Sequence, residues 1–343
     1  MDYPVEGVTV EELEENEVYK RFLSMQLAYE RGFVRLMPYQ QLVPKDFIEH
    51  AKTIKDFKVR DDDVWISSFP KCGTTWTQEM VWCIMNSLDF ETAKQRKLEQ
   101  RVPHFELTTI IEKTMLKKMA KGPTAWMEDP AATLKMSDRI PSPRIIKTHM
   151  SWQMLPDQLK SNSNAKILYV TRNPRDACVS FYNQWQFFQG FHGGFENFAE
   201  AFVNDVAGTW CPFIPHVLEY WNVRNLPNVC FITYEEMKAD LAGVILKVSS
   251  FLGHPVDEAK IPSLVDHLSF DKMKDNKAVN KEEMIKATQQ TMDDAHKTQN
   301  AKFMRKGLVG DWKNHLTPEL EKKFIEWEKK WLDGSDFEFK YEI

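Results

Sequence analysis

Four short apolar runs, each followed by turn or capping residues and then a helical pattern, dominate the distribution of hydrophobic and polar positions along the chain. Continuous apolar runs of this length are typical of parallel strands that are buried on both faces. We expect these strands at Val64–Ser68, Arg144–Thr148, Lys166–Thr171 and Val229–Thr233. Strands that alternate with helices predict an α/β fold with a central parallel sheet flanked by helices.

Capping and periodicity signals place several of the helices. Asn173 is expected to cap the helix after the third strand, with Pro174 in its first turn. Gly253 is expected just past the end of an amphipathic helix that follows the fourth strand. A last apolar stripe predicts a C-terminal helix that faces the core, through Leu320, Phe324, Trp327 and Trp331.

This pattern predicts one domain over residues 1–343, onto which about the first 40 residues pack as an extension. In open α/β sheets, ligands bind beyond the carboxyl ends of the strands. The segments at those ends are residues 69–76, 147–150 and 171–180.

The overall charge limits how the protein can bind an anion. The 343 residues include 45 lysines and arginines against 50 aspartates and glutamates, a net charge of −5. We expect no bulk basic surface for nucleic acid, so an anion must be held by a few placed donors. Aromatic residues make up 12% of the chain, which fits either a large aromatic core or an aromatic-lined pocket for a flat apolar ligand.

The cysteines and the N-terminal segment bear on location. Five cysteines, an odd number with no C-x-x-C pair, predict reduced thiols in a cytoplasmic protein rather than a disulfide framework or a zinc site. The acidic N-terminal segment lacks the basic and apolar regions of a signal peptide, and no apolar stretch approaches the length of a transmembrane helix. We therefore expect no membrane association.

The first strand runs into a loop with the chemistry of a phosphate site. The run FPKCGTTW (residues 69–76) supplies one glycine, one lysine and two adjacent hydroxyls at the start of a helix. The N–H groups of a helix N-terminus attract an anion, Gly73 lets the backbone approach it, and Lys71 adds a positive charge. The loop is P-loop-like without being a Walker A motif, because Lys71 precedes the only glycine. A basic strand–helix turn that binds nothing is the alternative interpretation.

Two more strand ends and one late segment carry basic residues. Lys147 and His149 share a face at the second strand end, where His can take a proton and Lys can stabilise developing negative charge. At the third strand end, Arg172 can bind a phosphate in a forked geometry, and Ser180 can add a hydroxyl to the same group. Residues 303–307, FMRKG, form a further candidate anion site. A structural role is the alternative for each feature taken alone.

The neighbouring Arg175 is assigned to a structural ion pair with Asp176 rather than to a ligand.

Six segments in family order resemble the cytosolic sulfotransferases, over about residues 60 to 315. They are FPKCGTTW, KTHM, RNPRDACVSFYNQW, FITYEEMKAD, HLSFDKMKDN and FMRKGLVGDWKNHL. The resemblance implies 3′-phosphoadenosine 5′-phosphosulfate (PAPS) as the donor, adenosine 3′,5′-bisphosphate (PAP) as the product, and no metal ion. The stretch 277–280 and the long N-terminus resemble insect members.

The resemblance also implies roles for single residues. The catalytic set comprises His149 as general base, Lys71 and Lys147 as stabilisers of the transferred charge, and Ser180. The donor is expected to contact Lys71, Cys72, Gly73, Thr74, Thr75, Trp76, Arg172, Ser180, Tyr234, Leu268, Ser269, Phe270, Met273, Phe303, Met304, Arg305, Lys306 and Gly307. An apolar acceptor is expected to contact Phe69, His104, Phe105, Lys147, His149, Phe181 and Trp185.

The chain departs from the family pattern in three places. Leu268 stands where many members have threonine, so one donor hydroxyl is missing. The family's short dimer motif is altered at Pro318 and Lys322, which leaves both a monomer and a homodimer open. In the phosphate loop, Cys72 replaces a common serine, although the backbone there can still bind.

The predicted function is in-line transfer of a sulfuryl group to the hydroxyl or amine of a small apolar acceptor, such as a phenol, steroid, catecholamine or retinoid. If the acceptor is an allylic alcohol, sulfate can leave again and the net reaction is a dehydration. Two competing functions are a nucleotide kinase-like phosphotransferase and a non-catalytic nucleotide-binding protein.

Overall fold

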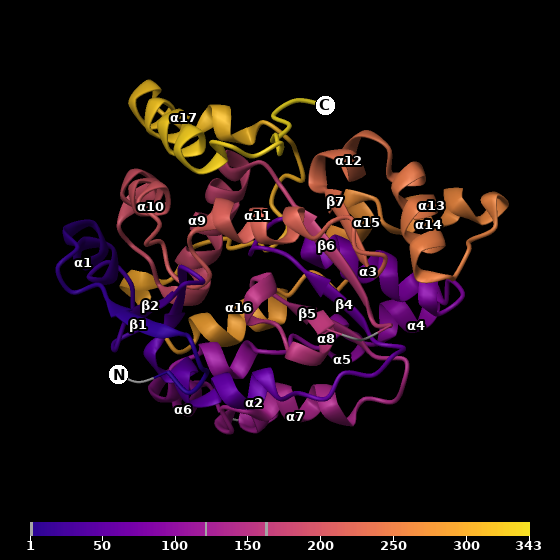
Figure 1. The fold of residues 1–343 in the computed structure, drawn as a ribbon, viewed down its shortest axis with the longest axis horizontal. Coiled ribbons are helices and arrows are strands. Elements are labelled where there is room, and N and C mark those ends of the chain that lie inside the picture. The colour runs from indigo at the N-terminus through magenta and orange to yellow at the C-terminus, as the bar shows by residue number, and fades with distance from the viewer. Residues whose placement is uncertain (1–2, 121, 162–163) are drawn as a thin grey trace.

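A four-stranded parallel sheet lies at the centre of the molecule (Figure 1). The computed structural model describes residues 3–120, 122–161 and 164–343. The strands, in the spatial order β5-β4-β6-β7, are β4 (Val64–Ser67), β5 (Ile145–Thr148), β6 (Lys166–Thr171) and β7 (Val229–Thr233). All three neighbouring pairs are parallel. The predicted α/β fold is confirmed, and two of the strands are one residue shorter than the pattern suggested.

The two faces of the sheet enter separate hydrophobic cores. On β6, Ile167 and Tyr169 contribute to one core, and Leu168 and Val170 contribute to the other. Helices α9 (Pro174–Gln189), α10 (Gly194–Val203), α11 (Phe213–Asn222) and α17 (Pro318–Leu332) cover the first core. Helices α3 (Thr74–Met85), α13 (Leu241–Leu252) and α14 (Ile261–His267) cover the second. Because both faces are covered, the strands carry apolar residues at nearly every position.

The expected helix ends are confirmed. The side chain of Asn173 accepts a hydrogen bond from the backbone N–H of Asp176 at 2.9 Å, and Pro174 opens α9. Gly253 ends α13 in the left-handed conformation, with φ of 73°. The C-terminal stripe is also confirmed as core, since Phe324 and Trp327 of α17 are buried.

The expected pair between Arg175 and Asp176 is wrong. Arg175 instead pairs with Glu321 and Glu328 of α17, each at 3.1 Å. Asp176 accepts hydrogen bonds from the backbone N–H groups of Gly310 and Trp312. Consecutive residues on a helix point in different directions, so neighbours in sequence do not face each other.

The N-terminal segment adds a second sheet that the sequence pattern did not predict. Strands β1 (Thr9–Glu12), β2 (Phe33–Met37) and β3 (Gln41–Pro44) form an antiparallel three-stranded sheet. Helix α1 (Glu17–Leu23) lies between β1 and β2 in sequence, and its Arg21 pairs with Glu200 of α10. Phe22, Phe33 and Leu42 enter the first core, so this segment is held by burial as well as by charge.

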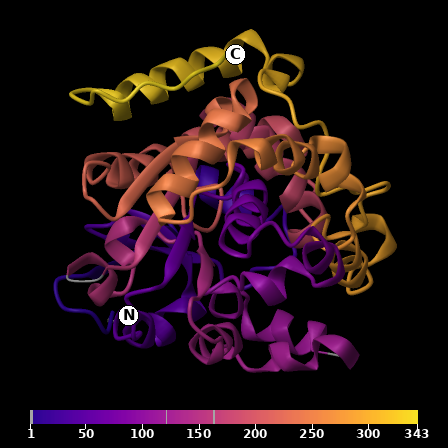
Figure 2. The same cartoon turned by 90° about the vertical axis from the view of Figure 1, so that its right-hand side faces the viewer.

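The remaining helices surround these layers. They are α2 (Ala51–Lys55), α4 (Phe90–Gln95), α5 (Leu98–Arg101), α6 (Lys113–Met119), α7 (Ala132–Arg139), α8 (Asp157–Ser161), α12 (Tyr234–Ala239), α15 (Phe270–Asp275) and α16 (Glu282–Gln289). Helix α17 lies along one edge of the molecule and α6 and α7 along the opposite edge; both views show α17 on the outside (Figures 1 and 2).

Within the described ranges, none of the helices has the length and apolar composition needed to cross a membrane. The five cysteines all lie in those ranges, and each is buried with a free thiol.

Candidate active site

One cavity of about 330 Å³ lies at the carboxyl ends of the central strands. Its walls come from the loop after β4, from the ends of β5 and β6, from α9, and from residues 268–273, 281–288 and 303–308. This is the edge at which an open α/β sheet binds ligands. The three strand-end segments expected from the sequence therefore meet in one place.

The loop after β4 has the backbone shape of an anion cradle. Gly73 precedes α3 with φ of 102°, and a Cβ placed there would lie 2.9 Å from Cδ2 of Tyr234. Lys71 also has a positive φ, 70°, and its Nζ lies 3.7 Å from the centre of the Phe303 ring. Burial, followed by the nearby charges of Lys281, Arg172 and Arg305 in that order, lowers the pKa of Lys71 to about 7.

A cluster of cations surrounds this end of the cavity. The Arg172 guanidinium lies over the Tyr234 ring at 4.4 Å and donates to the carbonyl oxygen of Leu308 at 2.6 Å. Its Nε is buried and has no hydrogen-bond partner among the described residues. Arg305 and Lys306 both pair with Asp311.

Burial raises the pKa of Asp311, but the hydrogen bonds from Lys306 and Arg305 outweigh it, so the carboxylate stays ionised. The ionised Asp311 therefore holds Arg305 and Lys306 in place beside the cavity.

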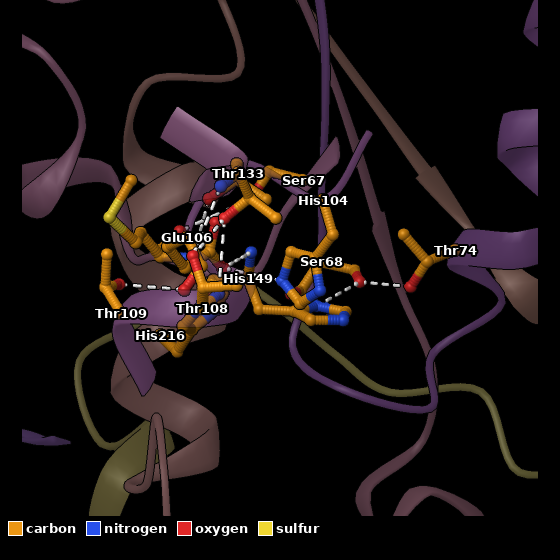
Figure 3. Close-up of polar contacts among 12 residues, drawn as sticks. Ser67, Ser68, Thr74, His104, Glu106, Thr108, Thr109, Thr133, His149 and His216 are labelled. Atoms are coloured by element: carbon orange, nitrogen blue, oxygen red, sulfur yellow. Dashed lines mark hydrogen bonds and ion pairs between the residues drawn. The ribbon is translucent and has the colours of Figure 1, made fainter. Parts of the chain in front are cut away.

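His149 has one ring nitrogen without a hydrogen-bond partner among the described residues, and the residue lines the cavity. Its Nδ1–H donates to the carbonyl oxygen of Ser68 at 2.7 Å, so the neutral ring carries its lone pair on Nε2 (Figure 3). The backbone N–H of His149 donates to Oε1 of Glu106 at 2.6 Å. Burial, and then the charge of Lys147, hold the pKa of His149 well below its ordinary value. The imidazole is therefore neutral at pH 7 and can accept a proton.

Glu106 brings a second imidazole beside the first. Its Oε1 is 3.0 Å from Nε2 of His104, and the rings of His104 and His149 meet edge to face with centres 5.1 Å apart (Figure 3). The backbone of Lys147 holds the segment around His104 in place. Its N–H donates to the carbonyl oxygen of Pro103 at 2.9 Å, and its carbonyl oxygen accepts from the N–H of Phe105 at 2.8 Å. Burial raises the pKa of Glu106 to about 7, although the N–H of His149 opposes the rise. Burial also holds the pKa of Lys147 well below its ordinary range.

An apolar wall extends from this centre. Phe181 and Trp185 of α9 line it, as expected from the sequence. Further lining residues were not predicted: Tyr29, Leu107, Ile110, Ile111, Met115, Met119, Met127, Phe188, Trp210 and Met284. The spacing of residues 107, 110 and 111 is a helical signal that could have marked part of this wall.

Most of the predicted site residues line the cavity together. These are Lys71, Gly73, Thr74, Thr75, Trp76, His104, Lys147, His149, Arg172, Ser180, Phe181, Trp185, Tyr234, Leu268, Phe270, Met273, Phe303, Met304, Arg305, Lys306 and Gly307. Trp76 is fixed by its Nε1–H, which donates to the carbonyl oxygen of Leu268 at 2.9 Å.

Four predicted contact residues do not line the cavity. Phe69 and Phe105 are fully buried in the aromatic core, where Phe69 packs on Phe213 at 4.8 Å and Phe105 packs on Phe57 at 4.7 Å. Along an extended segment the side chains alternate, so His104 faces the cavity and Phe105 faces the core. The Cys72 side chain is also fully buried, and Ser269 stands at the N-cap position of α15 outside the lining.

A separate buried cluster lies beside α3. Glu79, Cys83 and His267 bring potential ligand atoms within 4.8 Å of one another. Arg101 already pairs with Glu79 at 2.7 Å, and His267 bonds the other carboxylate oxygen at 2.7 Å. The carboxylate is therefore satisfied by a buried ion pair.

The fold and the cavity together define a class of protein. A helix N-terminus and the basic residues of the lining suit a multiply charged anion, and aromatic rings beside them suit a flat base. A neutral histidine in the same cavity as Lys71 and Lys147 suits proton removal during transfer of an anionic group. The molecule is thus a group-transfer enzyme that uses a phosphorylated donor.

The comparisons with known proteins identify the family. The sulfotransferase domain family matches residues 61–336. Luciferin sulfotransferase of Photinus pyralis is 40% identical over 295 residues, which cover 85% of this chain and 77% of that protein. Human sulfotransferase 1C2 is 32% identical over 303 residues, covering 86% of this chain and 92% of that protein. The chain belongs to the sulfotransferase family.

Solved structures agree with this assignment. A structure of retinol dehydratase with retinol and PAP has a TM-score of 0.85 and 27% identity, and the match covers 99% of this chain and 100% of that one. Mouse sulfotransferase SULT7A1 with PAP has a TM-score of 0.61 and 25% identity, and the match covers 89% and 95% of the two chains. The protein is a sulfotransferase with PAPS as donor, and phosphotransfer is not supported. The unpaired Nε of Arg172 and the Gly73 cradle fit a phosphorylated nucleotide.

Proposed function

We propose that this sulfotransferase acts on the hydroxyl group of an apolar acceptor of steroid or retinoid size, with His149 as the general base. The observation that carries the proposal is that one cavity joins a neutral imidazole, whose Nε2 is free, to a long apolar wall. Two similar structures, both of retinol dehydratase, hold androsterone and retinol respectively.

The proposed mechanism assigns each polar group one task. PAPS, when bound, supplies a sulfuryl group whose bond to the phosphate oxygen breaks, leaving the electron pair on that oxygen. Nε2 of His149 takes the acceptor's hydroxyl proton while the acceptor oxygen bonds to sulfur, which contributes about 10²–10⁴-fold in rate. Lys71 and Lys147 face the negative charge that develops. An anionic ligand beside them raises their pKa values again, so both bind it as ammonium groups.

The donor is proposed to lie along the basic end of the cavity. The N–H groups at the start of α3 would hold the 5′ end, and Trp76, Tyr234 and Phe270 would enclose the base. The 3′-phosphate would contact Arg172, Ser180, Arg305, Lys306 and Gly307.

The apolar wall favours a hydroxyl acceptor over an amine. Among the described lining residues, the carboxylates are Glu99 and Asp311, and each already pairs with a lysine or arginine. A protonated amine such as a catecholamine would find no buried, unpaired carboxylate there, because the buried Asp311 stays paired with Arg305 and Lys306. Phenols, steroids and retinoids need no such partner.

An acceptor panel with labelled PAPS tests this proposal. We expect more sulfate transfer to steroids or retinoids than to simple phenols, and little transfer to catecholamines. A preference for catecholamines would contradict the acceptor class. For allylic alcohols, mass spectrometry separates a sulfate ester from an alkene and so distinguishes transfer from net dehydration.

We also propose a cytoplasmic location and a monomer or homodimer that does not use the family's dimer motif. Five buried free thiols fit a reducing compartment. Pro318 opens α17 and Lys322 is exposed on it, at the two altered positions of the family dimer motif. Sedimentation of the purified chain, with a Lys322→Glu variant for comparison, tests whether this surface has any part in association.

A further inference from the structure

Lys281, in a polar segment without an expected role, lines the cavity that holds the two expected catalytic lysines. Lys281 precedes α16 and lines the same cavity as Lys71 and Lys147. Its side chain is only 11% exposed. Its Nζ lies 5.0 Å from the centre of the Phe303 ring, and the Nζ of Lys71 lies 3.7 Å from the same ring. Two ammonium groups therefore share one aromatic ring.

The charge of Lys281 acts on both expected catalytic lysines. It is the charge that most strongly lowers the pKa of Lys71, ahead of Arg172 and Arg305. It is also the foremost charged neighbour of Lys147, ahead of Glu106, Glu99 and Lys71. Burial, then the charge of Lys147 and then that of Lys281 lower the pKa of His104. Lys281 thus lines one cavity with Lys71 and Lys147 and is the nearby charge that affects both of them most.

The backbone at Lys281 is held in an unfavourable conformation. Its φ is 58°, in the left-handed region that a residue with a long side chain rarely adopts. Lys71 has a positive φ as well. Residues in such conformations persist where the surrounding structure fixes them, and they gather at functional sites. Here the carbonyl of Lys281 accepts the first hydrogen bond of α16, from Ile285 at 3.0 Å.

The counter-ion of Lys281 is weakly attached. Oε1 of Glu99 lies 3.4 Å from Nζ, and the Glu99 side chain is 36% exposed. An ion pair at this distance, open to water, is readily exchanged for a stronger anionic partner. Lys281 can therefore leave Glu99 for a ligand without leaving a buried carboxylate unpaired.

We propose that Lys281 is a further catalytic residue of sulfuryl transfer, whose ammonium group turns from Glu99 to the sulfuryl oxygens between Lys71 and Lys147. The inference rests on the proposed function. One S–O bond to the phosphate breaks, one S–O bond to the acceptor forms, and the acceptor proton goes to His149. Lys281 transfers no proton and acts as a third fixed positive charge facing the oxygens that carry the negative charge.

The test compares three variants with the wild-type enzyme. Lys281→Asn removes the charge with a residue that tolerates the left-handed conformation. Lys281→Arg keeps the charge, and Lys286→Asn is the matched control on the exposed side of α16. Melting temperatures confirm that each variant is folded. Calorimetry without acceptor gives the dissociation constants of PAP and PAPS, and initial rates give kcat and KM.

A sulfuryl contact predicts a specific pattern. Lys281→Asn should bind PAP as the wild type does but lose about tenfold of its affinity for PAPS, because only PAPS carries the sulfuryl group. Its kcat/KM should fall on the order of 10²-fold, as when one preorganised donor is removed. Lys281→Arg should retain most activity, and Lys286→Asn should match the wild type.

The pH profile adds a readout that a purely structural role would not change. The ionisable groups around Lys281 are Glu99, Lys71, Lys147, His104 and, next to them, Glu106. Removing one positive charge raises the pKa of Lys71 and Lys147 in the free enzyme. The decline of kcat/KM for PAPS at alkaline pH should therefore move to higher pH in Lys281→Asn.

Three results would overturn the assignment. The first is a kcat/KM of Lys281→Asn within about twofold of the wild type. The second is an equal loss of PAP and PAPS affinity, and the third is a folded Lys281→Arg as impaired as Lys281→Asn. If the wild type transferred sulfate to no acceptor, the proposed function would fail on its own, and the PAPS-to-PAP affinity ratio would still decide the role of Lys281.

Discussion

Replacing His149 with asparagine tests the reaction centre most directly. An asparagine amide can still donate to the carbonyl of Ser68, as Nδ1–H of His149 does at 2.7 Å, but it cannot take a proton. We expect kcat to fall by about 10²–10⁴-fold, which is roughly 3 to 5 kcal/mol of transition-state stabilisation. PAP affinity should hardly change, because the ring nitrogen that is lost faces the acceptor.

The pH dependence gives a second measure of the same residue. Burial, and then the neighbouring Lys147, lower the pKa of His149, so the neutral base persists below the ordinary value of about 6.5. On the acid side of the profile, wild-type kcat/KM should therefore decline only below about pH 6. The measurement is the initial rate of PAP release over about pH 5 to 9, with PAP binding by calorimetry at the same values.

The control for this experiment is His254→Asn, at an exposed histidine outside the cavity lining, which should match the wild type. A His149→Asn variant that kept more than about a tenth of the wild-type kcat would contradict the role of His149, since a general base contributes at least about 100-fold. An acid limb of the wild-type profile centred at or above about pH 6.5 would refute the lowered pKa.

Three further predictions address the donor cradle, the core and the absence of a metal requirement. Gly73→Ala should weaken PAP binding roughly tenfold or more, because a Cβ there is strained by about 1–2 kcal/mol and meets Tyr234 at 2.9 Å. Gly253→Ala has a similar positive φ but open space around it, so calorimetry should show unchanged PAP affinity. Arg144→Met should destabilise the fold by about 3–5 kcal/mol in urea unfolding, because it leaves the fully buried Asp63 carboxylate unpaired. Lys52→Met, which breaks an exposed pair, should leave the unfolding midpoint unchanged. Sulfate transfer should proceed at the same rate in EDTA, and a loss of activity that Mg²⁺ restores would contradict a mechanism that relies on lysines and histidine alone.

The sequence by itself determined the central sheet and the polar half of the site. Apolar runs such as Lys166–Thr171 predict strands because a parallel strand with both faces covered must be apolar throughout. The phosphate loop, Lys147 with His149, and Arg172 stand at the ends of such runs, so their meeting at one edge follows from the topology of a parallel sheet. The signal is local and regular, and it needs no knowledge of distant contacts.

Only the tertiary structure decided the rest. Alternation along an extended segment turns His104 into the cavity and Phe105 into the core, and the register of that segment is set by its backbone bonds to Lys147. Lys281 joins the reaction centre from a polar stretch far along the chain, where nothing in the local sequence distinguishes it from Lys286. The apolar wall also combines separate segments. Local periodicity fixes which face of an element is apolar, but the packing of distant elements decides which faces close around a shared cavity.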